Sequence, residues 1–353
     1  MSRSQFLTKK AKMNKQKIIQ EDMERIARVL PDAKNFNNKS ILVTGANGML
    51  AAYLVSFFTY LNEVSGAGIK VYALSRNGKR LKERFGDRVE ILAQDVTAEI
   101  CVSGELDYIF HLAGMADPVS IKTDPVGIIR ANVQGTMNVL ELAREKGALV
   151  VFASTREVYG AMPEGTYLIH EEDAGSLDPA DSRSCYPESK RLAETLLVSY
   201  HNQYYVNFIN TRIAHAYGPG MRLENDGRVM ADFLSDAVAG RDIVLKSAGT
   251  ALRAFCYVSD AISGMLTAVL RGEKNLSYNL ANETEEISVR GLAELCAEFS
   301  PADIGCTFDK GADQSGYVKF KRVALDTSRL EVLGWKPEVS LRDGIKRTIE
   351  FFG

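Results

Sequence analysis

Tyr186 and Lys190, in the segment Tyr-Pro-Glu-Ser-Lys, could form a proton-transfer pair. On a helix, residues four positions apart share a face, so the lysine ammonium can lie close to the phenol. A nearby cation favours the phenolate and lowers the pKa of the tyrosine. Tyr186 could then act as a general base if a hydroxyl such as that of Thr155 helps to hold a substrate alcohol. Pro187 is compatible with this arrangement, because proline is tolerated in the first turn of a helix.

A glycine-containing turn upstream could bind a dinucleotide. The apolar run 41–43 is typical of a buried strand, and Thr-Gly-Ala-Asn-Gly-Met-Leu-Ala follows it at 44–51, before an apolar helical stretch to Leu61. Glycines between a strand and a helix let the backbone approach a pyrophosphate, and the helix N-terminus supplies amides and a positive dipole. Ala51 replaces the usual third glycine, which affects helix–strand packing more than phosphate contact. Together with Tyr186 and Lys190, this turn predicts a dinucleotide site.

The pattern of apolar runs predicts the elements that position these groups. From 40 to about 155, short apolar runs alternate with amphipathic segments, and the runs are 41–43, 69–74, 89–92, 107–112 and 148–153. This alternation predicts an α/β fold with a doubly wound parallel sheet and with ligands at the carboxyl ends of the strands. We expect a helix near 124–146, another helix reaching about Tyr204, and a strand at 206–212.

Several short motifs share one order and spacing with a known family. They are the glycine turn, Asp95-Val96, Asp107 to Gly114, Asn132 to Thr136, Ser154 to Gly160, Tyr186 to Lys190, Arg212 to Gly220, Arg253 to Asp260 and Leu333 to Pro337. On these motifs the chain resembles the extended short-chain dehydrogenase/reductase family, specifically its NAD(P)-dependent nucleotide-sugar epimerases, dehydratases and decarboxylases. The motifs are most similar to those of UDP-glucuronate decarboxylase-like enzymes. The resemblance implies a Rossmann-type sheet with a smaller C-terminal α/β substrate lobe.

The chain divides into three predicted parts. Residues 1–39 form an N-terminal basic and helical extension, 40–220 mainly the dinucleotide-binding Rossmann domain, and 221–353 mainly the substrate-binding lobe, interleaved with the first. The first 20 residues hold six Lys/Arg and no acid. Ile19, Met23, Ile26 and Leu30 then recur at helical spacing, so we expect a helix that packs on the body or on a partner subunit. An arm that contacts RNA or a membrane is the alternative.

The glycine turn and the resemblance together predict the cofactor site. Its residues are Gly45, Ala46, Asn47, Gly48, Met49, Leu50, Ser75, Arg76, Asn77, Asp95, Val96, Leu112, Ala113, Gly114, Asn132, Tyr186, Lys190 and His215. The resemblance implies that Asp95 contacts the adenine edge and that Leu112 to Gly114 line the cofactor. His111, beside that segment, is interpreted as a hydrogen-bonded packing residue and not as a base.

The end of the second strand bears on the choice between NAD and NADP. An acid at that position binds the ribose 2′-hydroxyl, whereas an arginine accommodates a 2′-phosphate. This chain has no acid there, and Ser75 with Arg76 could bind a 2′-phosphate, which favours NADP. The alternative is that Arg76 stacks on the adenine, which leaves NAD acceptable.

The resemblance implies oxidation of a sugar at C4. Tyr186 would remove the proton of the 4-hydroxyl while hydride leaves C4, so the cofactor carries the redox step. The resulting 4-ketone acidifies C5 and permits elimination at C6, inversion, or loss of a C5 carboxylate. Glu157 is the candidate acid/base for the step that follows, and the predicted catalytic residues are Thr155, Glu157, Tyr186 and Lys190. The alternative is that Glu157 only caps the chain or pairs with Arg156.

Arg156 separates the chain from one branch of the family. Dehydratases of deoxythymidine-diphosphate glucose carry Thr-Asp-Glu in this loop, with the aspartate as the acid at C6, so Arg156 argues against that dehydration. UDP-glucuronate decarboxylases and GDP-mannose dehydratases carry Thr-Ser-Glu, to which Thr155-x-Glu157 is closer.

The predicted substrate-binding residues are Thr155, His215, Arg222, Arg253 and Arg322. Guanidinium groups suit a diphosphate or an anionic sugar because they bind phosphate and carboxylate in bidentate geometry. Arg253 and Arg322 match arginines that bind substrate in the resembling family, and a solvated surface role is the alternative, strongest for Arg222. In the resembling family an asparagine commonly contacts the substrate at the position of His215. The identity of the substrate sugar therefore cannot be inferred from any one relative.

The composition argues against a nucleic-acid-binding, membrane-spanning, disulfide-rich or zinc protein. The 353 residues are 46% hydrophobic and 25% charged with a formal net charge of −2, which is ordinary for a globular protein and gives no pull toward nucleic acid. No apolar run approaches the ~20 residues of a membrane span. The five scattered cysteines support neither a disulfide framework nor a zinc site. The basic N-terminus lacks a signal-peptide core, so we expect a cytoplasmic enzyme, and we expect a homodimer.

The leading functional hypothesis is an enzyme that modifies the sugar of a nucleotide-diphosphate sugar through a transient 4-keto intermediate. The preferred reaction is decarboxylation or epimerisation of a UDP-uronate-like substrate, and 4,6-dehydration is ranked second. One alternative is an NADPH-dependent 4-keto nucleotide-sugar reductase. The other is a non-catalytic NAD(P)-sensing protein, against which the intact set Thr155, Tyr186 and Lys190 argues.

Overall fold

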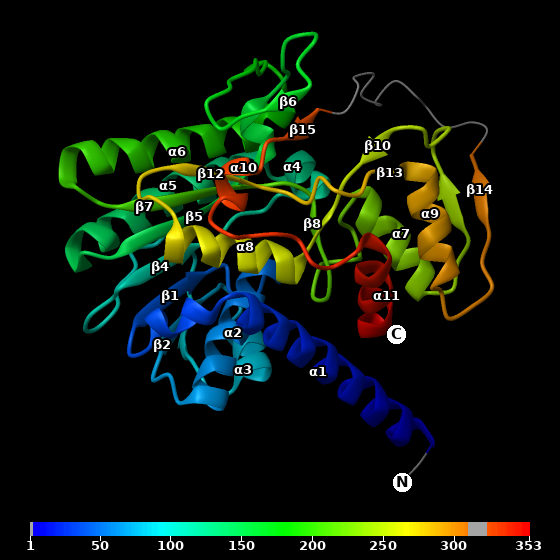
Figure 1. The fold of residues 1–353 in the computed structure, drawn as a ribbon, viewed down its shortest axis with the longest axis horizontal. Coiled ribbons are helices and arrows are strands. Elements are labelled where there is room, and N and C mark those ends of the chain that lie inside the picture. The colour runs from blue at the N-terminus through cyan, green and yellow to red at the C-terminus, as the bar shows by residue number, and fades with distance from the viewer. Residues whose placement is uncertain (1–2, 310–322) are drawn as a thin grey trace.

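The computed structural model describes residues 3–309 and 323–353 and is built around one seven-stranded parallel sheet (Figure 1). Its strand order is β12-β7-β5-β4-β1-β2-β3. The strands are β1 (Ser40–Thr44), β2 (Lys70–Leu74), β3 (Glu90–Leu92), β4 (Tyr108–His111), β5 (Leu149–Thr155), β7 (Phe208–Ile213) and β12 (Ser277–Leu280). The predicted doubly wound Rossmann-type sheet is confirmed. Most strands are apolar on both faces because helices cover the sheet on both sides.

Two groups of helices cover the two faces of this sheet. The helices beside it are α2 (Met49–Ser65), α3 (Gly78–Phe85), α4 (Pro118–Thr123), α5 (Pro125–Lys146), α6 (Cys185–Tyr204) and α8 (Val258–Arg271). On one face α5 and α6 pack against each other and bury Val139, Leu140 and Leu197 with strand residues such as Val150. On the other face α2 and α8 pack together over Val43 and Val151. The core therefore lies in two layers, one on each side of the sheet.

The C-terminal part contributes short elements beside the sheet. Its helices are α7 (Val229–Val238), α9 (Val289–Glu298), α10 (Ser328–Glu331) and α11 (Leu341–Phe352), and its strands are β8 (Ala216–Tyr217), β9 (Ile243–Leu245), β10 (Leu252–Arg253), β11 (Cys256–Tyr257), β13 (Ile287–Ser288), β14 (Cys306–Phe308) and β15 (Ala324–Leu325). They form two-stranded pairs: β10 with β13, β11 with β8, β14 with β9, and β15 with β6 (Leu168–Ile169). The strand β12 returns to the edge of the central sheet, so this part is interleaved with the first. A domain boundary at 220 stays a prediction.

The N-terminal helix α1 (Arg3–Val29) packs on the body of the same chain, followed by a short 3-10 helix, η1 (Pro31–Phe36). It contacts α2, α8 and α11, and its apolar stripe includes the buried Met23 and Ile26. On the same buried face, Asp22 accepts hydrogen bonds from the Tyr53 and Tyr257 hydroxyls, both at 2.9 Å, and from Arg347 Nη2 at 2.8 Å. One carboxylate therefore joins three elements to α1.

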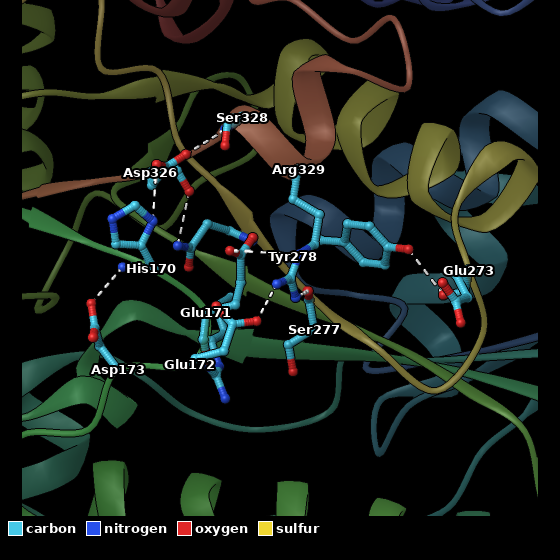
Figure 2. Close-up of polar contacts among 12 residues, drawn as sticks. His170, Glu171, Glu172, Asp173, Glu273, Ser277, Tyr278, Asp326, Ser328 and Arg329 are labelled. Atoms are coloured by element: carbon cyan, nitrogen blue, oxygen red, sulfur yellow. Dashed lines mark hydrogen bonds and ion pairs between the residues drawn. The ribbon is translucent and has the colours of Figure 1, made fainter.

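Polar contacts join the loop around β6 to the chain that follows residue 322 (Figure 2). Arg329 of α10 contacts Glu172 and lies 3.8 Å from a Glu171 oxygen, and its Nη1 donates to the Ser277 carbonyl at 3.0 Å. His170 Nδ1 lies 3.0 Å from Asp326 Oδ2. These contacts hold β15 parallel to β6.

Within 3–309 and 323–353, no helix combines the length and the apolar character that a membrane crossing requires. The same residues contain no cluster of His, Cys, Asp and Glu able to hold a metal ion.

Candidate active site

The glycine turn lies at the carboxyl ends of β1 and β4, and its geometry suits a diphosphate. Gly45 has a φ of +70°, and a Cβ added there would lie 2.9 Å from the Ala113 Cα and the Leu112 carbonyl oxygen, so a side chain is excluded. Gly48 precedes α2, and no described side chain caps the amides of the first turn at Met49. Free amides at a helix N-terminus bind anions. The residues present therefore fit a dinucleotide pyrophosphate.

The ends of β1 and β2 are tied together by Asn47. Its Nδ2 donates to Ser75 Oγ at 2.8 Å and to the Asn77 carbonyl at 3.0 Å. Its Oδ1 is buried and has no hydrogen-bond partner in the part of the chain that the structure describes. A bound ligand with a hydroxyl or amino group would satisfy this oxygen. Ser75 and Asn77 therefore lie together with Asn47, as the predicted cofactor site requires.

Arg76 and Asp95 lie beside this group at the surface. The Arg76 Nε is 3.9 Å from Asp95 Oδ2, and the Arg76 side chain is 70% exposed. The Thr97 backbone amide and hydroxyl donate to Asp95 at 2.9 and 2.8 Å, and they hold the pKa of Asp95 below its usual value. Val96, the next residue, is buried against Gly135. Arg76 is thus free to reorient toward a ligand on this edge.

His111 is a packing residue, as its position beside the cofactor-lining segment indicated. The Thr44 hydroxyl accepts from the Leu112 and Ala113 amides, so its own proton is donated to His111 Nδ1 at 2.8 Å. His111 Nε2 then donates to Thr136 Oγ1 at 3.1 Å. Burial lowers the pKa of His111 to about 3, so the ring is neutral and not a base in the working pH range.

The Thr136 hydroxyl continues this chain of hydrogen bonds to Asn132, whose carbonyl accepts from it at 2.6 Å. Asn132 Nδ2 donates to Ser189 Oγ at 2.9 Å, whereas Oδ1 is buried without a partner among residues 3–309 and 323–353. A Cβ added at Gly114 would lie 2.8 Å from that Oδ1 and 3.8 Å from Lys190 Nζ. Asn132, Gly114 and Lys190 therefore meet at one place.

Tyr186 and Lys190 lie on the first two turns of α6, both nearly buried. The Tyr186 and Thr155 hydroxyls are hydrogen-bonded to each other, as the chemistry requires. Lys190 Nζ donates to the Ala153 carbonyl at 2.8 Å, and burial lowers the pKa of Lys190 to about 8. The expected lowering of the Tyr186 pKa by Lys190 is not found. Burial, together with the negative charge of Glu157, raises the pKa of Tyr186 well above its usual value.

Glu157 lies beside Tyr186 on the short 3-10 helix η2 (Arg156–Tyr159) that follows β5. Burial raises the pKa of Glu157, while the positive charges of Arg183 and Arg156 act to lower it. A carboxyl with a raised pKa keeps its proton to a higher pH than an ordinary glutamate, so it can serve as a proton donor over a wider pH range. Glu157 lies beside Tyr186, and its acid/base role stays a prediction.

Two cations near the site were not predicted from the sequence. Arg183 belongs to the short 3-10 helix η3 (Ser182–Ser184), and its charge acts on Glu157. Arg228 precedes α7 and binds Asp226 through two contacts of 2.6 and 2.7 Å, while its charge acts on Tyr186. Neither stands in a motif, so no spacing signal could have found them.

The predicted substrate residues fall into different places. Arg253 is half-buried, its Nη1 donates to the Leu252 carbonyl at 2.8 Å, and its charge acts on Arg156. His215 is exposed with a φ of +46°, and its ring lies edge-on to Phe255 at 5.8 Å. Arg222 is exposed, and its Nε donates to the Glu224 carbonyl at 2.8 Å. The structure thus brings Arg253 near the catalytic group, no described contact connects Arg222 with it, and Arg322 lies outside the described residues.

Known proteins are similar to this chain in sequence and in fold. The sequence model of the NAD dependent epimerase/dehydratase family matches residues 41–281. UDP-glucuronic acid decarboxylase 6 of Arabidopsis thaliana is 35% identical over 321 residues, which cover 90% of this chain and 89% of the relative. A UDP-glucose 4-epimerase of Thermotoga maritima, solved with UDP-glucose, has a TM-score of 0.76 at 23% identity and covers 89% of this chain and 98% of its own. The Bordetella bronchiseptica enzyme WbmF, solved with NAD+, has a TM-score of 0.69 at 24% identity over 90% and 93% of the two chains.

Proposed function

The chain belongs to the NAD dependent epimerase/dehydratase family, and from this premise we propose that it decarboxylates a UDP-glucuronate-like nucleotide sugar. At the coarser level it is an NAD(P)-dependent enzyme that modifies the sugar of a nucleotide-diphosphate sugar through a 4-keto intermediate. The observation that carries the finer proposal is the position of Glu157, beside Tyr186 and under the positive charges of Arg156 and Arg183. The 35% identity with a decarboxylase supports the choice among the family's reactions.

The side chains divide the proposed chemistry between them. Thr155 holds the sugar 4-hydroxyl against Tyr186, and Tyr186 takes its proton. When bound, the nicotinamide accepts hydride from C4 and returns it later in the cycle. The Lys190 ammonium, next to Asn132 and Gly114, faces the cofactor site and favours the phenolate once a ligand draws it from the Ala153 carbonyl.

The carboxylate is lost from the 4-keto sugar. The C6 carboxylate is then β to the C4 carbonyl, so the C5–C6 bond breaks to release carbon dioxide and leaves its electron pair in an enolate. Glu157, with its raised pKa, supplies the proton to C5. A UDP-sugar epimerase would use the same first step, and the arrangement of Thr155, Tyr186 and Lys190 does not distinguish the two.

The cofactor is expected to be NADP in preference to NAD. The support is the absence of an acid at the end of β2 and the presence there of Ser75 and the exposed Arg76. The NAD-bound relative WbmF and the family's description favour NAD instead. Calorimetry with the two cofactors compares their affinities, and tighter binding of NAD contradicts the NADP preference.

A homodimer is expected through the outer face of α5 and α6. Helix α5 exposes the apolar side chains of Val126, Ile129 and Met137, and α6 exposes those of Leu192 and Val198. A second copy of the chain would cover them in a helix-on-helix interface. Sedimentation velocity tests this assembly. A cytoplasmic location and a substrate-binding role for 221–353 belong to the same proposal.

A panel of nucleotide sugars tests the reaction directly. The purified enzyme is incubated with NAD or NADP and each sugar, and the products are read by mass. Loss of carbon dioxide from UDP-glucuronate supports decarboxylation. No mass change with a new sugar isomer indicates epimerisation, loss of water indicates dehydration, and a gain of two hydrogens indicates reduction.

A further inference from the structure

Arg156 has a guanidinium group that the protein only partly satisfies. It follows Thr155 and precedes Glu157 on η2, so it lies within the catalytic segment. Its Nη2 donates to the Val323 carbonyl at 2.9 Å. Its Nε is buried and has no acceptor in the described parts of the chain, 3–309 and 323–353. A buried donor of a charged group without a partner is costly, so a ligand that accepts from it gains binding energy.

The guanidinium of Arg156 is held in position by the chain segment that begins at Val323. Val323 immediately precedes β15, which pairs with β6 through Ala324 and Leu325. The contacts of His170 with Asp326 and of Arg329 with Glu172 hold that pair in place (Figure 2). An anchored arginine loses less side-chain freedom on binding, which favours a directed contact with a ligand.

The charges around Arg156 leave an excess of positive charge. Burial lowers the pKa of Arg156, the charge of Arg253 lowers it further, and the charge of Glu157 acts in the opposite direction. Arg183 also acts on Glu157. Two guanidinium groups, of Arg156 and Arg183, thus act on the one carboxyl of Glu157, and a third, of Arg253, acts on Arg156. A ligand carboxylate would balance this charge, whereas a neutral hydroxymethyl oxygen could accept from the Arg156 Nε but would bring no negative charge.

We propose that Arg156 binds the carboxylate on C6 of a uronate and thereby determines the specificity of the site for an anionic sugar. This inference rests on the proposed function and identifies the residue that reads the carboxylate. A site built to pair a charged group disfavours an analogue that lacks the charge, because a neutral hydroxyl accepts a weaker hydrogen bond and leaves the buried cation without a counter-charge. Arg253 remains available for the diphosphate. The two arginines would then bind the two anionic groups of one substrate, Arg156 the C6 carboxylate and Arg253 the diphosphate.

Binding measurements on an inactive background test this role. The Tyr186→Phe protein is loaded with cofactor, and UDP-glucuronate and UDP-glucose are titrated by calorimetry, with and without Arg156→Gln. The glutamine keeps an amide donor but carries no charge. We expect UDP-glucuronate to bind about ten- to a hundred-fold tighter than UDP-glucose with Arg156, and the two to differ by less than about three-fold with glutamine. Arg156→Lys should keep part of the preference.

Three outcomes overturn the inference, and a fourth separates it from the proposed reaction. If both sugars weaken equally in Arg156→Gln, Arg156 supports the site without recognising the carboxylate. If the preference for UDP-glucuronate persists in the variant, another group reads the carboxylate. If Arg156→Gln does not fold, Arg156→Lys replaces it in the comparison. A preference for UDP-glucuronate below three-fold in both the Tyr186→Phe parent and the lysine variant excludes carboxylate recognition by Arg156. A parent that prefers UDP-glucuronate while the native enzyme releases no carbon dioxide contradicts decarboxylation and leaves the role of Arg156 standing.

Discussion

At the scale of residues, the catalytic group is held by hydrogen bonds to its neighbours before any ligand binds. Tyr186 is paired with Thr155, and Lys190 is held by the Ala153 carbonyl. Burial keeps Tyr186 protonated in this state, since its pKa is raised. The phenol is therefore poised to react only when bound ligands bring positive charge near it.

Replacing Tyr186 by phenylalanine should abolish turnover and leave dinucleotide affinity within a few-fold, because the phenol is lost but the contacts of Gly45 to Leu50 remain. Steady-state rates and cofactor titration measure the two effects. Tyr205→Phe is the matched control, since Tyr205 is 82% exposed beyond the end of α6 and should keep native activity. Full activity of Tyr186→Phe would refute the catalytic assignment.

Glu157→Gln should separate oxidation from the later proton transfer. With substrate in a single turnover, the variant should form reduced cofactor at a near-native rate and then stall before product, because C5 receives no proton. Rapid-mixing absorbance at the reduced-nicotinamide band follows the first step, and mass analysis follows the second. Glu164→Gln, an exposed loop carboxylate, is the control. A native overall rate in Glu157→Gln would remove Glu157 from the mechanism.

The pH dependence should have an alkaline limb near pH 8. Burial lowers the pKa of Lys190 to about 8, and its charged form is the one that favours the phenolate, so kcat/KM falls as the pH rises through that value. His111 contributes no limb above pH 5, because its pKa is about 3. A pH–rate profile that stays flat to pH 10 would show that Lys190 is not the titrating group.

At the scale of elements, α1 joins parts of the fold that are distant in sequence. Asp22 receives hydrogen bonds from Tyr53 on α2, from Tyr257 at the start of α8 and from Arg347 on α11. Because Tyr257 follows Arg253 closely, α1 also supports the segment that carries a candidate substrate arginine.

Asp22→Ala should lower the free energy of unfolding by roughly 3–5 kcal/mol, because two buried hydroxyls lose their acceptor and Arg347 loses one of its two carboxylate partners, Asp22 and Glu21. Urea denaturation at neutral pH measures the change. Glu24→Ala, two positions along on the exposed face of the same helix, should change it by less than about 0.5 kcal/mol. Equal effects of the two changes would mean that the Asp22 contacts add no stability.

The elements differ in how well the sequence predicts them. The runs 69–74 and 148–153 correspond to β2 at Lys70–Leu74 and β5 at Leu149–Thr155, because buried parallel strands read as continuous apolar segments. The pairs β10–β13 and β8–β11 have two residues per strand, too few to show a period. The glycine turn and the Tyr186–Lys190 pair are local and could be predicted, whereas Arg183 and Arg228 reach the site only through tertiary contacts.

At the scale of the whole molecule, the interleaved chain places the site where two parts meet. The glycine turn, Thr155 and Tyr186 come from the ends of the sheet strands and from α6, while Arg253 comes from the short strands beyond it. Strand β12 ties the second part to the sheet edge beside β7. A substrate that bridges Tyr186 and Arg253 would therefore contact both parts at once.

The stoichiometry of the cofactor tests the central claim most directly. The enzyme is given UDP-glucuronate in large excess over NAD or NADP, and carbon dioxide and reduced nicotinamide are followed together. Because hydride taken from C4 is returned in the same cycle, we predict many molecules of carbon dioxide per cofactor and no steady rise in reduced nicotinamide. One reduced nicotinamide left behind per product, or turnover without carbon dioxide, would contradict decarboxylation through a transient 4-keto sugar.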